Sequence, residues 1–369
     1  MQSLFGLHTA KQAEQNIAAR LVEDQFLPDL NSMEEQDKEQ LAENRQIAKE
    51  AVQKAIEDGI ESLDTELNPV IVDAIERELQ KCDSRIKKLG TQYKKSLVSD
   101  TKKIYDQYIE LLLLIGEFQS IFKLNPKQSD SSNFVSNKFI QTILETDELE
   151  KITIRKGISW QAHISVLRSW VKDVIRTDET FIEYQNKKEP SFEEDQKIVL
   201  YLYKSVLFKN ETIAQYFEAS DIHWSENAAV LKSMVLKTWK SIEQQGDVPL
   251  LMELSKNWEE DLLFLEKIFQ LTLKHEEEYT SIIAEKSKNW EVDRIATTDR
   301  ILLAMAVSEM INFPSIPVKV TINEYIELSK LYSTPKSKQY VNGILDVLSL
   351  ELKKAGKIKK TGRGLLDNK

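Results

Sequence analysis

The most informative part of the sequence is residues 290–348, which read WEVDRIATTDRILLAMAVSEMINFPSIPVKVTINEYIELSKLYSTPKSKQYVNGILDVL. Its apolar residues recur every three or four positions, the spacing that places side chains on one face of a helix. The first helical stripe is expected to end at the stiff turn that contains Pro314 and Pro317. The residues of this stripe are Ile295, Leu302, Ala306 and Met310.

Two more helices are expected after that turn. Thr321 and Glu324 have the spacing of a capping box, which predicts the start of a helix over INEYIELSKLY. Thr334 and Pro335 are typical of the N-cap and first position of a last helix, which Gly356 is expected to close. The expected buried face of that helix comprises Val341, Ile344, Leu345, Leu348 and Leu352. Three helices with short connections predict a compact C-terminal subdomain.

The composition predicts an all-α fold for the rest of the chain. The 369 residues include only 10 Gly and 8 Pro, too few turn-forming residues for many short strands. The apolar fraction of 41% is enough to fill a core. A second helical stripe supports this prediction, with spacings of three and four, and consists of Ile104, Tyr108, Leu111, Ile115, Phe118 and Phe122.

Four consecutive segments are expected along the chain. Residues 1–33 form N-terminal helices, and residues 34–100 form an acidic, charged helical insertion that is exposed to solvent. Residues 101–285 combine the core helix with a helical insertion, separated by a polar loop at 125–133. Residues 286–369 form the C-terminal subdomain with a basic tail.

Charge is distributed unevenly along the chain. The net charge is −10, which by itself disfavours an anionic partner. Residues 34–66 contain eleven acids and four bases, whereas residues 331–369 contain nine bases and three acids. The basic C-terminal end is therefore where an anionic partner is expected to bind.

The cysteine count and the apolar runs indicate a cytoplasmic protein without a membrane segment. Cys82 is the only cysteine, so an internal disulfide is impossible and no cysteine pair exists to bind zinc. The strongest apolar run, 111–115, is flanked by Glu110 and Glu117, and residues 1–15 lack the pattern of a secretion signal.

A helical metal enzyme is an alternative to a binding protein. His223 with Glu226, and His275 with Glu278, each place an imidazole and a carboxylate on one helical face. Helical di-metal sites carry the acid before the histidine and need two more inward-facing acids, which the sequence does not provide. No glycine-rich phosphate loop or nucleophile motif is present. We therefore expect a protein that binds rather than an enzyme, without a cofactor or metal.

The stretch 290–348 resembles the C-terminal half of the NusB transcription antitermination family, above all in VKVTINEYIELSK and YVNGILD. Residues 1–30 and 100–122 resemble the family more weakly, and the rest resembles the insertions of an elongated version of it. The resemblance implies two packed helical subdomains of the NusB type, here with long helical insertions. It also implies RNA binding at boxA-type single-stranded elements of ribosomal RNA transcripts, together with the ribosomal protein NusE in the transcription elongation complex.

The start of the last helix is the expected RNA site. Free backbone amides and the positive end of a helix dipole are suited to binding phosphate. Lysines in the first turn are unfavourable to the helix's own dipole, which indicates that they bind an external anion. Tyr340 is placed to stack on a base, although its neighbour Val341 also allows it to lie at the edge of the core. The RNA-binding positions that the resemblance implies are Lys336, Ser337, Lys338, Gln339 and Tyr340.

The resemblance also implies a surface for NusE. Its positions are Phe5 on the first helix and Asp293, Asp299 and Arg300 before and within the helix of the first stripe. Family members begin with an arginine-rich arm, whereas residues 1–5, MQSLF, match the interior of the first family helix, so we expect the arm upstream of Met1. The alternative to an RNA-binding factor is a helical scaffold that recruits proteins and does not bind RNA.

Overall fold

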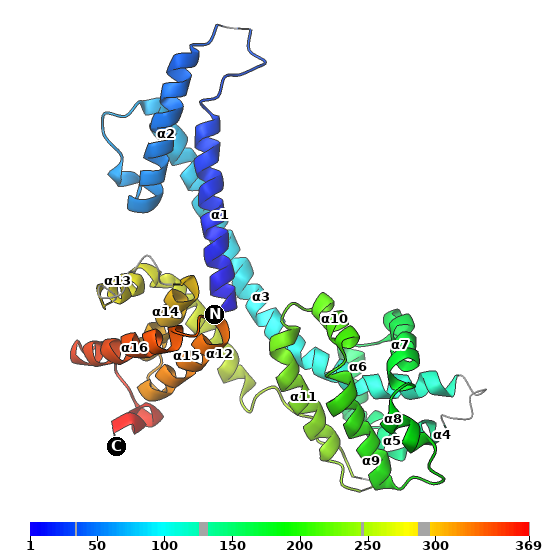
Figure 1. Ribbon diagram of the computed structural model, residues 1–369. Coiled ribbons are helices and arrows are strands. Elements are labelled where there is room, and N and C mark those ends of the chain that lie inside the picture. Colours follow the sequence, from blue (N-terminus) through cyan, green and yellow to red (C-terminus); the bar gives the residue numbers. More distant parts are fainter. Residues whose placement is uncertain (34, 125–131, 245–246, 287–295, 369) are drawn as a thin grey trace. The chain divides into compact units, whose positions relative to one another are not determined.

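The computed structural model describes residues 1–33, 35–124, 132–244, 247–286 and 296–368 (Figure 1). Within these ranges every regular element is a helix, which confirms the all-α class. None of the described helices is both long and apolar enough to span a membrane.

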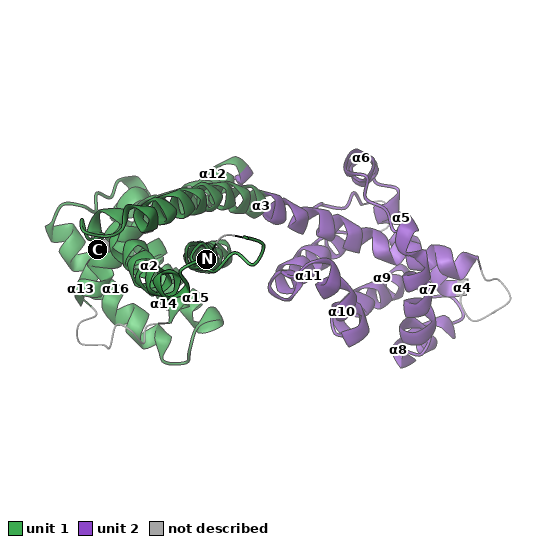
Figure 2. Ribbon diagram, turned by 90° about the horizontal axis from the view of Figure 1, so that it is seen from above, with its two compact units in different colours: residues 1–98, 259–369 green, residues 99–258 purple. Residues whose placement is uncertain are grey.

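The chain divides into two compact units, which Figure 2 shows in different colours. Unit 1 comprises residues 1–98 and 259–369, and unit 2 comprises residues 99–258. This division differs from the four consecutive segments that the sequence suggested. Helices from both ends of the chain pack together in unit 1, and such long-range pairing leaves no boundary in local composition.

Unit 1 contains the first two helices and the last five. The first part of α3, Pro69–Lys123, also belongs to it. The other elements of unit 1 are α1 (Gln2–Asp24), α2 (Lys38–Asp58), η1 (Ile60–Ser62), α12 (Trp258–Lys274), α13 (Glu276–Lys286), α14 (Thr297–Asn312), α15 (Val318–Tyr332), α16 (Ser337–Lys354) and η7 (Gly362–Asn368).

Helix α2 packs against α1 and α3 through small side chains. Ala48, Val52 and Ala55 of α2 are buried together with Ala18 of α1 and Ile75 of α3. The expectation that this acidic segment is simply exposed is therefore only partly right. Its charged face is in solvent, but alanines spaced three and four residues apart form a narrow buried stripe, which a search for large apolar residues overlooks.

Helix α14 lies at the centre of the second core of unit 1. All residues from Leu302 to Met310 are buried, so this helix has no solvent-exposed face over more than two turns. A helix that is apolar all round must be surrounded by others. It contacts α1, α13, α15 and α16. Tyr340 of α16 is part of this core, with 7% of its surface exposed.

The polar groups of α14 fix its neighbours. Glu309, itself buried, accepts hydrogen bonds from Thr321 at 2.8 Å and from Tyr325 at 3.1 Å, both on α15. Burial raises the pKa of Glu309. The capping box predicted from Thr321 and Glu324 is wrong, because α15 begins at Val318, after Pro317, and Thr321 is fully buried one turn further on.

Unit 2 consists of short helices packed around the second part of α3. Its elements are α4 (Ser132–Val135), α5 (Lys138–Leu144), α6 (Asp147–Lys156), η3 (Gln161–His163), α7 (Ile164–Trp170), η4 (Val171–Ile175), α8 (Glu179–Gln185), α9 (Phe192–Tyr201), η5 (Leu202–Leu207), α10 (Glu211–Ser220) and α11 (Trp224–Lys240). The stripe predicted on α3 is confirmed: Tyr108, Leu111, Ile115, Phe118 and Phe122 are buried, and Ile104 packs against them.

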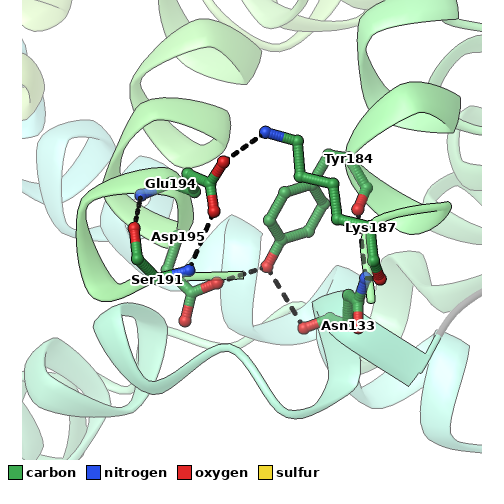
Figure 3. A network of polar contacts seen from close by, with 6 residues as sticks. All are labelled: Asn133, Tyr184, Lys187, Ser191, Glu194 and Asp195. Atoms are coloured by element: carbon green, nitrogen blue, oxygen red, sulfur yellow. Dashed lines mark hydrogen bonds and ion pairs between the residues drawn. The ribbon is translucent and has the colours of Figure 1, made fainter. Parts of the chain in front are cut away.

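A polar network joins three helices of unit 2, α4, α8 and α9 (Figure 3). The Tyr184 hydroxyl donates to the Asp195 carboxylate at 2.6 Å. Asn133 donates to backbone carbonyls at the end of α8, the nearest being that of Lys187 at 2.8 Å. Ser191 and Glu194 form a capping box at the start of α9. The network is saturated with internal partners, so we interpret it as structural.

We predict that Tyr340→Ala destabilises unit 1 by about 3–5 kcal/mol, because it removes a large buried side chain from a packed core. Thermal or urea denaturation measures this loss. Tyr340→Phe, which keeps the ring, should cost much less. Equal, negligible losses for both substitutions would contradict the core position of the ring.

We also predict a pH-dependent effect of Glu110→Gln. Burial, aided by the Asp106 carboxylate, raises the pKa of Glu110 from 4.5 to about 6. The folded state therefore holds this proton more tightly than the unfolded state, and this contribution to stability is lost as pH rises from 4.5 through 6. The loss amounts to about 2 kcal/mol.

The substitution should accordingly raise the unfolding temperature at pH 7.5, with the difference from the parent protein shrinking toward pH 4.5. Differential scanning fluorimetry across this range tests it. Glu183→Gln, at an exposed acid of α8, is the matched control and should have no such effect. A constant offset at all pH values would contradict the assignment.

Candidate functional site

The connection between α15 and α16 carries the predicted RNA site. Helix α16 begins at Ser337, with Lys336 at the N-cap, which is later than the start predicted at Thr334 and Pro335. The Thr334 carbonyl accepts the Ser337 amide at 2.9 Å and closes a turn ahead of the helix. The predicted N-cap is thus wrong, because the Thr334 hydroxyl contacts the Ser337 hydroxyl at 2.8 Å instead of capping a backbone amide.

Several amides at the start of α16 are already engaged. Besides the Ser337 amide, those of Gln339 and Tyr340 donate to the Lys336 carbonyl, at 3.2 and 3.4 Å. The helix start therefore offers a phosphate fewer free N–H groups than the sequence implied. Attraction of an anion at this place has to come mainly from side chains.

Three of the five predicted RNA-binding side chains are accessible. Lys336, Lys338 and Gln339 are exposed, the first at the N-cap and the others in the first turn of α16. Two ammonium groups within three residues of each other form a small cationic surface. Such a surface suits neighbouring phosphates of an extended strand.

The other two side chains point into the protein. Ser337 is 3% exposed, and its hydroxyl donates to the Asp299 carboxylate at 2.7 Å. Tyr340 lies in the α14 core, so its ring has no free face for a base. Both side chains are therefore buried in the structure and not on its surface. Between positions 336 and 340 the helical rotation turns two side chains inward.

The predicted partner-binding residues do not form one exposed set. Phe5 and Arg300 are exposed, whereas Asp299 is buried with 4% exposure and is bound to Ser337. Asp293 lies outside the described residues. Of the three predicted positions that the structure describes, Phe5 and Arg300 are placed to touch a protein directly.

A cavity of 1140 Å³ opens beside Arg300 within unit 1. Its wall contains apolar side chains and several cations from α1, α3, α12, α13 and α14. The residues that line it include Leu7, His8, Lys11, Phe269, Thr272 and Ile301.

Polar groups in this cavity wall are only partly satisfied. Burial lowers the pKa of His8, whose Nδ1 atom lies 3.8 Å from the Glu276 carboxylate. Lys11 supplies the cation for Glu276 at 3.4 Å. Among the described residues, His8 Nε2 and Thr272 Oγ1 are buried and have no hydrogen-bond partner. The cavity thus combines an apolar surface with unused polar capacity.

The basic tail is partly bound to unit 1. The Thr361 amide donates to the Pro314 carbonyl and the Lys360 ammonium donates to the Phe313 carbonyl, both at 2.9 Å. Lys357 pairs with Glu278 at 2.8 Å. Lys359 and Arg363 are exposed. The tail therefore contributes fewer available cations than its sequence suggested.

His223 and His275 each directly precede a helix, α11 and α13. His275 lies 3.3 Å from Glu278, which also binds Lys357. His223 stands at the N-cap of α11, where its backbone amide donates to Asp221. In the ranges that the structure describes, no three His, Cys, Asp or Glu residues are grouped to hold a metal ion.

Two residues of this site, Thr298 and Ser333, were not predicted from the sequence. The hydroxyls of Thr298 and Ser333 lie 3.2 Å apart and link the start of α14 to the end of α15. The available signal was the run of hydroxyl residues at both places, TTD at 297–299 and ST at 333–334. Such runs are common at helix ends, so the pairing became visible only in the folded chain.

Comparison with known proteins points to one family. The sequence model of the NusB family matches residues 228–349. A transcription antitermination protein NusB from Salinibacter ruber is 48% identical over 103 residues, which cover 28% of this chain and 64% of the relative. The protein of the same name from Chloroherpeton thalassium is 42% identical over 104 residues, covering 28% of this chain and 49% of the relative.

The chain thus spans about half to two thirds of the length of these relatives. A solved structure of T. maritima NusB is 20% identical, covers 42% of this chain and 90% of its own, and has a TM-score of 0.25, too low to bear on the fold. The sequence matches carry the comparison: residues 228–349 of this chain match the NusB family model, and the relatives named above are similar to this chain over just over a hundred residues.

Proposed function

We propose that this protein is a transcription antitermination factor that binds single-stranded, boxA-type RNA of ribosomal transcripts together with NusE. The observation that carries the proposal is the pair of exposed lysines, Lys336 and Lys338, at the start of α16 in a NusB family domain. Relatives of this domain bear the name transcription antitermination protein NusB.

The proposed RNA contact is electrostatic. Lys336 and Lys338 each offer a cation to a phosphate, and the Gln339 amide adds a donor and an acceptor for a base edge or a sugar. Base stacking by Tyr340 is not part of the proposal, because the ring is buried. Affinity is therefore expected to depend strongly on salt.

The proposed NusE surface lies on Phe5 of α1 and Arg300 of α14, together with the cavity beside Arg300. An exposed aromatic ring and an arginine are the residue types that contribute most at protein interfaces. The cavity is apolar at Leu7, Phe269 and Ile301, which suits an apolar side chain of the partner.

A helical scaffold that recruits proteins without binding RNA is the second candidate. The burial of Ser337 and Tyr340 favours it, because it removes two expected RNA contacts. The two functions differ in one measurement. A scaffold gives no salt-dependent binding of single-stranded RNA, whereas the proposed factor does.

We predict that the double substitution Lys336→Ala/Lys338→Ala lowers affinity for a boxA-type RNA oligonucleotide by about tenfold or more. The slope of log affinity against log salt should become shallower by about 1.4, since each phosphate contact to a single strand contributes about 0.7. Fluorescence anisotropy across a salt series measures both quantities.

The matched control is Lys353→Ala/Lys354→Ala, which removes two exposed charges from the opposite end of the same helix. It should leave the slope nearly unchanged. If both double variants weaken binding equally, the cationic surface at the start of α16 is not the RNA site. If the parent protein binds no RNA, the scaffold replaces the proposed function.

For the protein partner, we predict that Arg300→Glu lowers affinity for purified NusE by about tenfold, while affinity of the isolated protein for RNA changes little. Isothermal titration calorimetry measures the first effect and anisotropy the second. Arg20→Glu, at an exposed position of α1, is the charge-matched control. Unchanged NusE affinity in Arg300→Glu would place the partner surface elsewhere.

A further inference from the structure

The Asp299 carboxylate occupies an unusual position for a charged group. Asp299 lies in the first turn of α14, and only 4% of its surface is exposed. Its Oδ2 atom accepts a hydrogen bond from the Ser337 hydroxyl at 2.7 Å. Its Oδ1 atom is buried without a hydrogen-bond partner among the described residues. Burying a carboxylate carries a large desolvation cost unless the group is hydrogen-bonded, so the contact with Ser337 matters for the stability of this position.

Four hydroxyl groups are oriented by this carboxylate. An ionised carboxylate only accepts, so Ser337 must spend its single proton on Asp299. The contacts of Ser337 with Ser333, at 2.9 Å, and with Thr334, at 2.8 Å, are then contacts in which Ser337 accepts.

The same logic extends one step further. Because Ser333 donates to Ser337, its oxygen accepts the Thr298 hydroxyl at 3.2 Å. The protons thus all point along one direction, from Thr298 through Ser333 and Ser337 to Asp299. A chain of this kind strengthens each of its hydrogen bonds.

This chain of hydroxyls spans the connection that presents the exposed lysines. Ser333 and Thr334 precede Lys336, and Ser337 follows it, so residues on both sides of Lys336 are tied to α14. The negative charge of Asp299 also lies at the positive end of the α16 dipole, where it offsets the unfavourable placement of two lysines.

We propose that Asp299 is a positioning residue for RNA binding: it fixes the α15–α16 connection from inside, so that Lys336 and Lys338 are held in one arrangement toward the RNA. This inference rests on the proposed function. It gives Asp299 a role different from the direct partner contact that the family resemblance implied.

The test compares Asp299→Ala and Ser337→Ala with Thr321→Val. Thr321 is buried on α15 in the same core and also donates to a buried carboxylate, that of Glu309, so Thr321→Val is a matched loss of a buried hydrogen bond. All three variants should lower the unfolding temperature. Only the first two should act on the lysine-bearing connection.

The expected result has two readouts. In Asp299→Ala and Ser337→Ala, amide hydrogen exchange of residues 336–340 should become faster than in Thr321→Val at a temperature where all variants are folded. Affinity for the RNA oligonucleotide should fall by about fivefold to tenfold in both, and remain within about twofold of the parent in Thr321→Val. Asp299→Asn keeps an acceptor oxygen for Ser337 and should recover most of the affinity.

A double-mutant cycle separates positioning from general destabilisation. In the Lys336→Ala/Lys338→Ala background, Asp299→Ala should cause no further loss of RNA affinity, because the groups through which it acts are gone. Additive losses would overturn the positioning role, as would exchange at 336–340 equal to that of the Thr321→Val control.

Failure of the proposed function gives a different pattern. If the parent protein binds no RNA, the antitermination proposal fails and with it the RNA role of Asp299, whatever the exchange data show. If the parent binds RNA and the lysine variants weaken binding, but the Asp299 and Ser337 variants bind like the parent, only the present inference is overturned.

Discussion

The burial of residues 302–310 of α14 on every side is the constraint on which unit 1 depends. A buried polar side chain of this helix either finds an internal partner or bears a large desolvation cost. Asp299 finds Ser337 of α16, Glu309 finds Thr321 and Tyr325 of α15, and Asn312 donates to Tyr279 of α13. Three neighbouring helices are thus positioned by polar contacts to the same central helix.

These contacts connect the core to the proposed binding surface. At the start of α16, Lys336 is exposed and the next residue, Ser337, is buried. Adjacent residues therefore belong to the surface and to the core. A rigid scaffold behind a cationic turn reduces the conformational entropy lost when an RNA strand binds. The core of unit 1 therefore also supports the proposed binding surface at the start of α16.

Unit 2 contains its own core and its own polar network. Tyr203, fully buried, donates to the Leu111 carbonyl at 2.5 Å, and Asp195 is held by Tyr184 and by the Lys138 amide. Burial raises the pKa of Asp195, as it does for Glu309 in unit 1. Both units thus use buried carboxylates as acceptors that join one helix to another.

The sequence by itself determined the helical class, the stripe on α3, the turn at Pro314 and Pro317 and the family of the C-terminal region. The helical class and the stripe follow from composition and local spacing, which the helical repeat converts directly into a face. The family comes from the resemblance of motifs such as VKVTINEYIELSK and YVNGILD. Only the tertiary structure decided that Thr321 binds Glu309 rather than capping a helix, that Tyr340 and Ser337 face inward, and that Asp299 lies within the core.

A polar or aromatic residue near a helix start can interact with a partner in its own helix or with one on another helix, and the sequence does not distinguish the two. Which one it takes depends on the helix that packs against it. For the same reason the joining of residues 1–98 with 259–369 in unit 1 left no trace in composition, because the contacts that decide it connect segments separated by the whole of unit 2.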